Sequence, residues 1–234
     1  MPDDQTYCGV VSVLGAPNAG KSTLVNRMVG AKVSIVSPKV QTTRIRVRGV
    51  SLYANTQIIY VDTPGIFVPK RRLDRAMVDA AWGGAADADA IILLVDAQRG
   101  VDKDTQRIIE GLNKRKSTAS LVLNKVDAVR REDLLGLSEK LNGMADFSAT
   151  FMVSALKGGG VTDLEAKLRT LMPEGPWLFP EDEISDLPQR LLAAEITREK
   201  AYLYLHQELP YALAVGTESW EDFNNGEVRI EQAI

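Results

Sequence analysis

Several residue types are nearly absent from this sequence. Its 234 residues include one cysteine, Cys8, and one histidine, which excludes an intramolecular disulfide and a cysteine-based zinc site. The longest apolar run, residues 90–95, is far shorter than the roughly 20 residues that cross a bilayer. The first residues, MPDD, lack the basic start and apolar core of a secretory signal. We therefore expect a cytoplasmic protein in which Cys8 is a small apolar residue at the start of a strand.

Basic residues are scarce in the last part of the chain, where residues 173–234 hold 4 Lys and Arg against 13 Asp and Glu. Hydrophobic residues make up 45% and charged residues 25%, which excludes a disordered or collagen-like chain. The net charge of −3 is uneven, because residues 1–172 carry a net +6 and residues 173–234 a net −9. This shift indicates two units with different surfaces, although ordinary solvated surfaces on both would also account for it.

Short apolar runs alternate with helix-like stretches through residues 1–172. The runs are rich in β-branched residues and nearly continuous, which is typical of strands covered on both faces of a parallel sheet. Alternating strands and helices predict a three-layer α/β domain with a mostly parallel central sheet. Residues 44–52 read as an exposed edge strand, antiparallel to the others. The predicted strands are 10–14, 58–61, 91–95, 121–123 and 151–153, and the predicted helices are 21–29, 72–82, 103–114 and 162–171.

The pattern changes after residue 172. Residues 173–187 are acidic and rich in proline, and they predict a linker. A helix is expected from residue 188 to about 206, because a proline in the first turn suits a helix start, and strands are expected at 211–215 and 227–234. One helix and two strands bury little core, so residues 188–234 predict an incomplete α+β domain in which the chain ends.

The strongest chemical motif is GAPNAGKS at residues 15–22, which matches G-x-x-x-x-G-K-[ST] between a strand and a helix. Glycines let the backbone N–H groups point at a β-phosphate, at the positive end of a helix dipole. Lys21 adds a charge for the β- and γ-phosphates, and Ser22 offers a hydroxyl to Mg2+. A plain strand–helix turn is the alternative, which this context disfavours. The candidate residues are Gly15, Ala16, Pro17, Asn18, Ala19, Gly20, Lys21, Ser22 and Thr23.

A second motif, DTPG, follows the apolar run 58–61. The carboxylate of Asp62 at the end of this strand can reach Mg2+ through water, and the Gly65 N–H can meet a γ-phosphate. DTPG alone is a common turn sequence, but its place one strand after the phosphate loop makes it a specific signal. The candidate residues here are Asp62, Thr63, Pro64, Gly65 and Ile66.

A third motif, NKVD at residues 124–127, predicts the base. The Asp127 carboxylate can accept both the N1–H and the N2 amine of guanine, which adenine does not offer, so discrimination of roughly 10⁴-fold is expected. Lys125 would lie over the base, and Asn124 would tie this loop to the phosphate loop. After the next strand, Ser154, Ala155 and Leu156 are expected to supply a backbone N–H to guanine O6.

These motifs, in this order, resemble those of the translation-factor class of GTPases. Their exact residues resemble those of the Era family of bacterial ribosome-assembly GTPases. The resemblance covers nearly the whole chain. It implies slow hydrolysis of GTP to GDP in a molecular switch, Mg2+ as cofactor, and a monomer that binds 16S rRNA and the small ribosomal subunit through a C-terminal KH domain. It also implies peripheral association with the inner membrane. The segments that carry it are 15–23, 37–44, 61–66, 179–182, 195–200 and 208–211.

The resemblance also implies roles for single residues. Thr43, or alternatively Thr42, would bring a hydroxyl to Mg2+ beside Ser22 and Asp62, and Lys21, Thr43 and Gly65 would form the catalytic group. Ile66 occupies the position where many GTPases orient the attacking water with glutamine, so the water must be positioned otherwise. Asn18 would hold K+, unless its amide only caps the loop.

The sequence departs from a KH domain in one respect. That domain clamps RNA with a GXXG loop, whereas the glycines after residue 188 are Gly216 and Gly226. We therefore expect the RNA-binding element to lie beyond this sequence. Three alternatives stay open: an RNA-binding module with a regulatory nucleotide site, an Era-like enzyme of tRNA modification or large-subunit assembly, and a P-loop kinase, which would leave NKVD unexplained.

Overall fold

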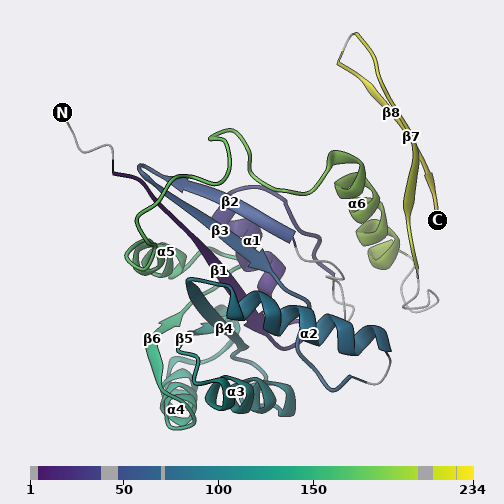
Figure 1. The fold of residues 1–234 in the computed structure, drawn as a ribbon. Coiled ribbons are helices and arrows are strands. Elements are labelled where there is room, and N and C mark those ends of the chain that lie inside the picture. Colours follow the sequence, from purple (N-terminus) through teal and green to yellow (C-terminus); the bar gives the residue numbers. More distant parts are fainter. Residues whose placement is uncertain (1–4, 38–46, 70–71, 205–212, 225) are drawn as a thin grey trace.

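A computed structural model describes residues 5–37, 47–69, 72–204, 213–224 and 226–234. Its main sheet has six strands in the order β2-β3-β1-β4-β5-β6 (Figure 1). Every neighbouring pair is parallel except β2 and β3, so the predicted parallel sheet with an antiparallel edge strand is confirmed. The strands are β1 (Tyr7–Gly15), β2 (Val47–Tyr53), β3 (Thr56–Asp62), β4 (Ala90–Asp96), β5 (Ala119–Asn124) and β6 (Phe147–Met152).

Helices cover both faces of this sheet (Figure 1). On one face, α1 and α5 pack over Ile92 and Leu94 of β4, and on the other face α2, α3 and α4 pack over Ile91, Leu93 and Val95. Alternate residues of one strand therefore enter two separate cores, which is why the apolar runs are continuous. The helices are α1 (Lys21–Val29), α2 (Arg72–Ala86), α3 (Lys103–Arg115), α4 (Arg131–Asn142) and α5 (Val161–Arg169), with a 3-10 turn at Val126–Ala128.

Helix α4 has no counterpart among the predicted helices. It buries only Leu134 and Leu141, so its apolar pattern is weak. Its N-terminal residue has no side-chain cap, and no start signal marks it. The other four helices lie within a few residues of their predicted ranges.

Residues 173–187, the predicted linker, lie along the sheet. The side-chain oxygen of buried Gln57 accepts the backbone N–H groups of Leu178 and Phe179 at 2.9 and 3.0 Å. The Val50 N–H donates to the Ile184 carbonyl at 2.9 Å, and Trp177 and Phe179 pack on a small core. This segment therefore protects the edge of β2, which would otherwise present unpaired backbone groups. The prediction that this edge strand is exposed is wrong for residues 47–52, most of which are buried; residues 44–46 lie outside the described residues.

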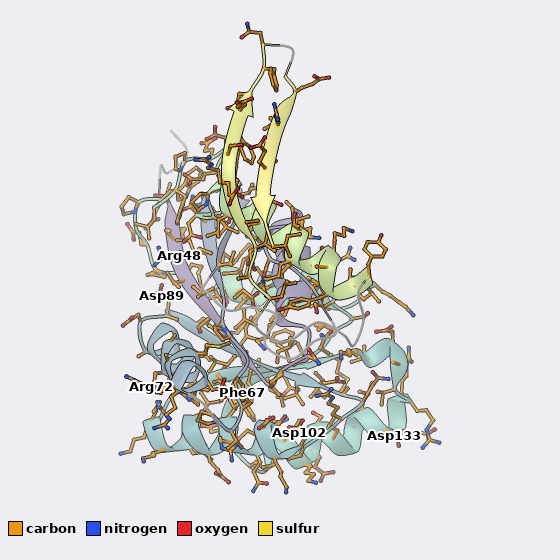
Figure 2. The ribbon with its side chains drawn as sticks, turned by 90° about the vertical axis from the view of Figure 1, so that its right-hand side faces the viewer. Arg48, Phe67, Arg72, Asp89, Asp102 and Asp133 are labelled. Carbon is orange, nitrogen blue, oxygen red and sulfur yellow. The ribbon has the colours of Figure 1, made fainter. Side chains whose placement is uncertain are left out.

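The C-terminal part contains α6 (Gln189–Tyr204) and an antiparallel pair, β7 (Gly216–Asp222) and β8 (Val228–Ala233). Figure 1 shows this hairpin projecting away from the main sheet, and Figure 2 shows side chains on both of its sides. The predicted strand at 211–215 is wrong for residues 213–215, because the strand begins at Gly216; residues 211–212 lie outside the described residues. The prediction placed the strand too early because the residues just before Gly216 are apolar, whereas the residues of β7 itself, GTESWED, are mostly polar.

Within the described ranges, no helix is long and apolar enough to cross a membrane. Cys8 lies in β1 and is buried, as predicted. Thr42 and Thr43 fall outside the described residues, so their predicted role has no structural counterpart here.

Candidate nucleotide site

The phosphate-loop motif lies between β1 and α1, at the carboxyl end of the sheet where parallel α/β folds bind ligands. It borders a cavity of about 570 Å3. Gly20 adopts φ +98°, and a Cβ there would lie 2.3 Å from Asn124 Nδ2, so only glycine fits. The predicted residues that line this cavity are Pro17, Asn18, Gly20, Lys21, Ser22, Thr23, Gly65 and Lys125.

Lys21 is buried at the start of α1. Its ammonium donates to the carbonyl oxygens of Gly15 and Ala16 at 3.2 and 3.1 Å. Burial lowers the pKa of Lys21 to about 8, while the nearby Asp62 charge opposes this shift. The side chain is therefore cationic below about pH 8 and is held across the phosphate loop, where an anion would raise its pKa again.

Asp62 is fully buried at the end of β3. One of its carboxylate oxygens accepts the hydroxyls of Ser22 at 2.7 Å and Ser34 at 2.6 Å. A hydroxyl and a carboxylate in contact supply the oxygen ligands that Mg2+ prefers, so the residues fit this ion. Ser34 was not predicted, because it lies in a loop with no motif of its own.

The residues after Asp62 contact β1 and the phosphate loop. The Thr63 hydroxyl donates to the Val13 carbonyl at 2.7 Å, and a Cβ on Gly65 would lie 3.0 Å from the Pro17 backbone. The Ile66 N–H donates to the Gly15 carbonyl at 3.1 Å. Its side chain is fully buried in the core with Leu14, so Ile66 contributes backbone to the site and its side chain does not line the cavity.

Asn124 joins three segments at the end of β5. Its amide donates to the Ala19 carbonyl at 2.8 Å, and its oxygen accepts the Ala155 N–H at 3.0 Å. The predicted tie between Asn124 and the phosphate loop is therefore present. Guanine O6 would have to compete with Asn124 for the Ala155 donor.

A smaller cavity of about 270 Å3 adjoins the NKVD motif and is lined by Asn124, Lys125, Asp127, Ser154, Ala155 and Leu156, among others. A hydrogen bond with Ser154, followed by contact with Lys157, lowers the pKa of the exposed Asp127 carboxyl; the Lys157 ammonium is 3.3 Å away. The group is ionised at neutral pH, so both of its oxygens can accept hydrogen bonds, as the pairing with guanine requires.

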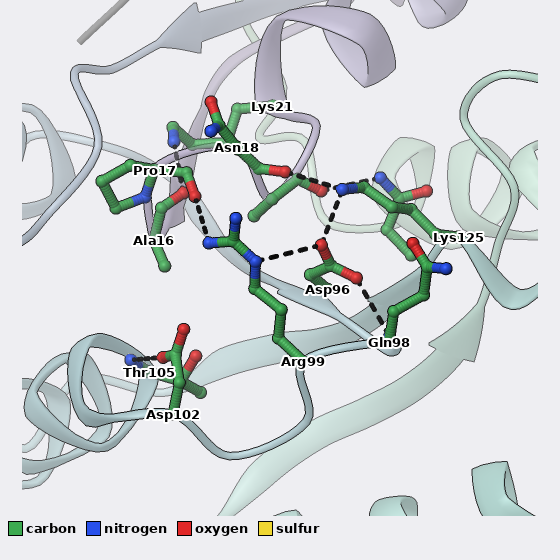
Figure 3. A network of polar contacts seen from close by, with 12 residues as sticks. Ala16, Pro17, Asn18, Lys21, Asp96, Gln98, Arg99, Asp102, Thr105 and Lys125 are labelled. Atoms are coloured by element: carbon green, nitrogen blue, oxygen red, sulfur yellow. Dashed lines mark hydrogen bonds and ion pairs between the residues drawn. The ribbon is translucent and has the colours of Figure 1, made fainter. Parts of the chain in front are cut away.

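Lys125 makes contacts that the sequence did not predict. Its backbone is left-handed, with φ 63°, and its ammonium donates to the Asn18 carbonyl at 2.9 Å and to Asp96 at 2.6 Å (Figure 3). The charged end of Lys125 is therefore bound to protein, and the residue also lines the cavity. Asp96 and the nearby Arg99 were not predicted, although both follow an apolar strand at the same edge of the sheet as Asp62 and Asn124.

Helix α6 forms part of the same site, which no sequence signal indicated. The buried Glu199 carboxylate accepts the Val36 N–H at 2.9 Å and pairs with Lys32, and Leu203 lines the large cavity. The C-terminal segment therefore holds residues 32–36, which lead into the predicted first switch at residues 37–44.

Replacing Glu199 with alanine is expected to lower the free energy of unfolding by about 1–2 kcal/mol, because the part-buried Val36 N–H and the partly exposed Lys32 ammonium lose a charged partner. Urea denaturation measures this. Glu139→Ala, on the exposed face of α4, serves as the control. An equal effect of the two substitutions would mean that Glu199 does not fasten α6 to residues 32–36.

Comparison with known proteins shows that this chain is similar to GTPases over nearly its whole length. A family described as 50S ribosome-binding GTPase matches residues 10–125. The chain is 61% identical over 229 residues to the GTPase Era of Rhizobium meliloti, covering 98% of this chain and 73% of the relative. It is 58% identical to the GTPase Era of Dinoroseobacter shibae, covering 98% of this chain and 75% of that one.

Solved structures agree with these relatives. Era bound to MgGDPNP and nucleotides 1506–1542 of 16S ribosomal RNA is 38% identical, with a TM-score of 0.90 over 97% of this chain and 78% of that one. A singly substituted variant of Aquifex aeolicus Era bound to GDP.AlF4- gives the same TM-score at 37% identity, over 97% of this chain and 78% of that one. With this identity over nearly its whole length and the P-loop GTPase fold in common, the chain belongs to the Era family and is a GTP-hydrolysing enzyme.

Proposed function

We propose that this GTPase is a nucleotide-dependent switch in assembly of the small ribosomal subunit, with 16S rRNA as its partner. One observation supports this most directly. The solved relative that matches 97% of this chain holds both a GTP analogue and 16S rRNA nucleotides. By the same resemblance we propose a cytoplasmic monomer with peripheral association at the inner membrane.

In this proposal residues 1–172 form the GTP-binding domain, residues 173–187 the linker and residues 188–234 part of a KH-type RNA-binding domain. The negative charge of residues 173–234 argues against strong RNA binding by this segment. RNA backbones are bound mainly through cations, whereas these residues carry a net −9. RNA affinity would therefore come chiefly from the part of the relatives that this chain does not cover.

The proposed nucleotide contacts follow from the geometry of the site. Lys21 would turn from the Gly15 and Ala16 carbonyls toward the β- and γ-phosphates, which lie at the positive end of α1. Gly65 would donate its N–H to the γ-phosphate. Asn124, Lys125 and Asp127 would hold guanine, with the loop at 154–156 closing over O6.

Ser22 and Asp62 would hold Mg2+, with Thr43 joining them when GTP is bound. Bound there, Mg2+ neutralises charge on the β- and γ-phosphates. The chain itself arranges the oxygens, because Ser34 and Ser22 hold one Asp62 carboxylate oxygen in place between them. This pre-orders the carboxylate without any movement of β3.

Intrinsic turnover is expected to be slow, on the order of 10⁻⁴ to 10⁻² s⁻¹, because the buried Ile66 side chain cannot orient water. If Asn18 holds K+, turnover in potassium chloride will exceed that in sodium chloride at equal ionic strength. Phosphate release under single-turnover conditions measures both rates. Equal rates in the two salts would contradict the K+ proposal. They would not affect the explanation of the slow rate by Ile66.

The RNA proposal is tested by filter binding at two salt concentrations. The probes are an oligonucleotide of 16S nucleotides 1506–1542, a 23S rRNA fragment of equal length, and a tRNA. Two proteins are compared: this chain, and the full-length GTPase Era of Rhizobium meliloti, of which this chain covers 73%. We expect weak, salt-sensitive binding by the first and 16S-selective binding by the second. Preference for 23S rRNA or tRNA would favour the alternative roles in large-subunit assembly or tRNA modification.

A further inference from the structure

Arg99 belongs to a tight turn that directs it at the phosphate loop. The turn follows β4, where the Asp96 carbonyl accepts the N–H groups of Arg99 and Gly100 at 3.1 and 3.0 Å. The Asp96 side chain accepts the Gln98 N–H at 3.0 Å, and Gly100 has φ +63°. The backbone and the side chain of Asp96 therefore fix the backbone of the turn from which the Arg99 side chain extends.

The guanidinium of Arg99 lies against the phosphate loop (Figure 3). One Nη1–H donates to the Pro17 carbonyl at 3.3 Å, and Nε lies 3.8 Å from the Asp96 carboxylate. Arg99 lines the same cavity as Lys21 and Gly65. A guanidinium carries five N–H donors, so it can keep the Pro17 contact and still donate to an anion in the cavity.

Among the described residues that line this cavity, three are cationic: Lys21, Lys125 and Arg99. The Lys125 ammonium already binds Asp96 and the Asn18 carbonyl. The Lys21 ammonium is bound to the Gly15 and Ala16 carbonyls. Arg99 instead donates to the Pro17 carbonyl, and a Cβ on Gly65 would lie 3.0 Å from the Pro17 backbone. Arg99 therefore adds a second cation on the side of the loop next to Gly65, whose N–H is predicted to meet the γ-phosphate.

GTP hydrolysis develops negative charge that a cation near the γ-phosphate can stabilise. The oxygen of a water molecule forms a bond to the γ-phosphorus, and the bond from that phosphorus to the β–γ bridging oxygen breaks. The bridging oxygen leaves with the electron pair on GDP, and the water proton passes to the phosphate product or solvent. Negative charge spreads over the transferred group in the transition state, where an arginine is worth 10³–10⁵ in rate in other GTPases.

We propose that Arg99 supplies this guanidinium in cis and stabilises the charge that develops on the γ-phosphoryl group. The proposal rests on the assignment of the cavity to GTP. A purely structural role is the competing account, in which Arg99 only fastens the turn after β4 to Pro17. That role would affect GTP and GDP binding as much as turnover, whereas a charge-stabilising role affects turnover and transition-state mimics.

The test compares Arg99→Ala, Arg99→Lys and Arg107→Ala, the last being an arginine of α3 that pairs with Asp104 at 3.3 Å. Single-turnover hydrolysis, GDP affinity, and affinity for GDP with aluminium fluoride are measured for each. We expect Arg99→Ala to lower the rate and the aluminium fluoride affinity about 10- to 1,000-fold, below the range for a dedicated arginine. GDP affinity should stay within about threefold, Arg99→Lys should recover part of the loss, and Arg107→Ala should match the unsubstituted chain.

Two results would overturn the proposal: an unchanged rate in Arg99→Ala, or a loss of GDP affinity as large as the loss of rate. Failure of the site assignment looks different. In that case Lys21→Ala would bind GTP normally, whatever Arg99→Ala does. The two failures are therefore distinguishable in one set of proteins.

Discussion

Lys21→Ala will weaken Mg2+-dependent GTP binding by a factor of about 100 to 10,000. Its ammonium is positioned at the start of α1, and the substitution removes charge-assisted contacts to two phosphates. Contacts of this kind contribute about 1.5–3 kcal/mol each, and every 1.4 kcal/mol is a tenfold change in affinity. Because the contacts go to the β- and γ-phosphates, GDP binding should suffer less than GTP binding.

Fluorescence titration with a labelled GTP analogue measures this loss. Circular dichroism checks that the protein stays folded, which we expect because Asp62, the buried charge near Lys21, keeps its hydrogen bonds from Ser22 and Ser34. Lys140→Ala, an exposed lysine of α4, removes the same charge far from the loop and should bind GTP normally. A normal dissociation constant for Lys21→Ala would refute the phosphate-loop assignment.

Asp127→Asn will change the base that the protein prefers. A carboxylate accepts from the two donors of guanine, whereas an amide offers one donor and one acceptor, which suits xanthine. The hydrogen bond with Ser154 and the contact with Lys157 hold the pKa of the Asp127 carboxyl below its usual range, so its oxygens stay acceptors at neutral pH. We expect GTP affinity to fall roughly 100-fold or more and XTP affinity to rise.

Competition between GTP and XTP for the unsubstituted chain and the variant measures this exchange. Asp163→Asn, an exposed position in the first turn of α5, makes the same chemical change away from the cavity and should leave the preference for GTP intact. Retention of that preference by Asp127→Asn would remove Asp127 from the base-binding site.

Local signals in the sequence were enough to predict the fold and that the motifs lie together at one edge of the sheet. The apolar runs predict a parallel sheet because each strand is covered on both faces, and Ile91 and Ile92 do enter opposite cores. The phosphate loop and the DTPG and NKVD motifs predict their neighbourhood because strands of a parallel sheet end at one edge. Such inferences need only residues that are close in sequence and one rule of topology.

The contacts that complete the site depended on the tertiary structure. Asp96 at the end of β4 and Arg99 in the following turn gain their roles only when β4 lies between β1 and β5, which brings Asp96 to Lys125 and Arg99 to Pro17. Ser34 gains its role only when its loop meets Asp62, and Glu199 lies 163 residues from its partner Val36. No local pattern records such pairs, because an ion pair or hydrogen bond requires only that two polar groups arrive at the same point, and the packing of the whole chain decides which groups arrive.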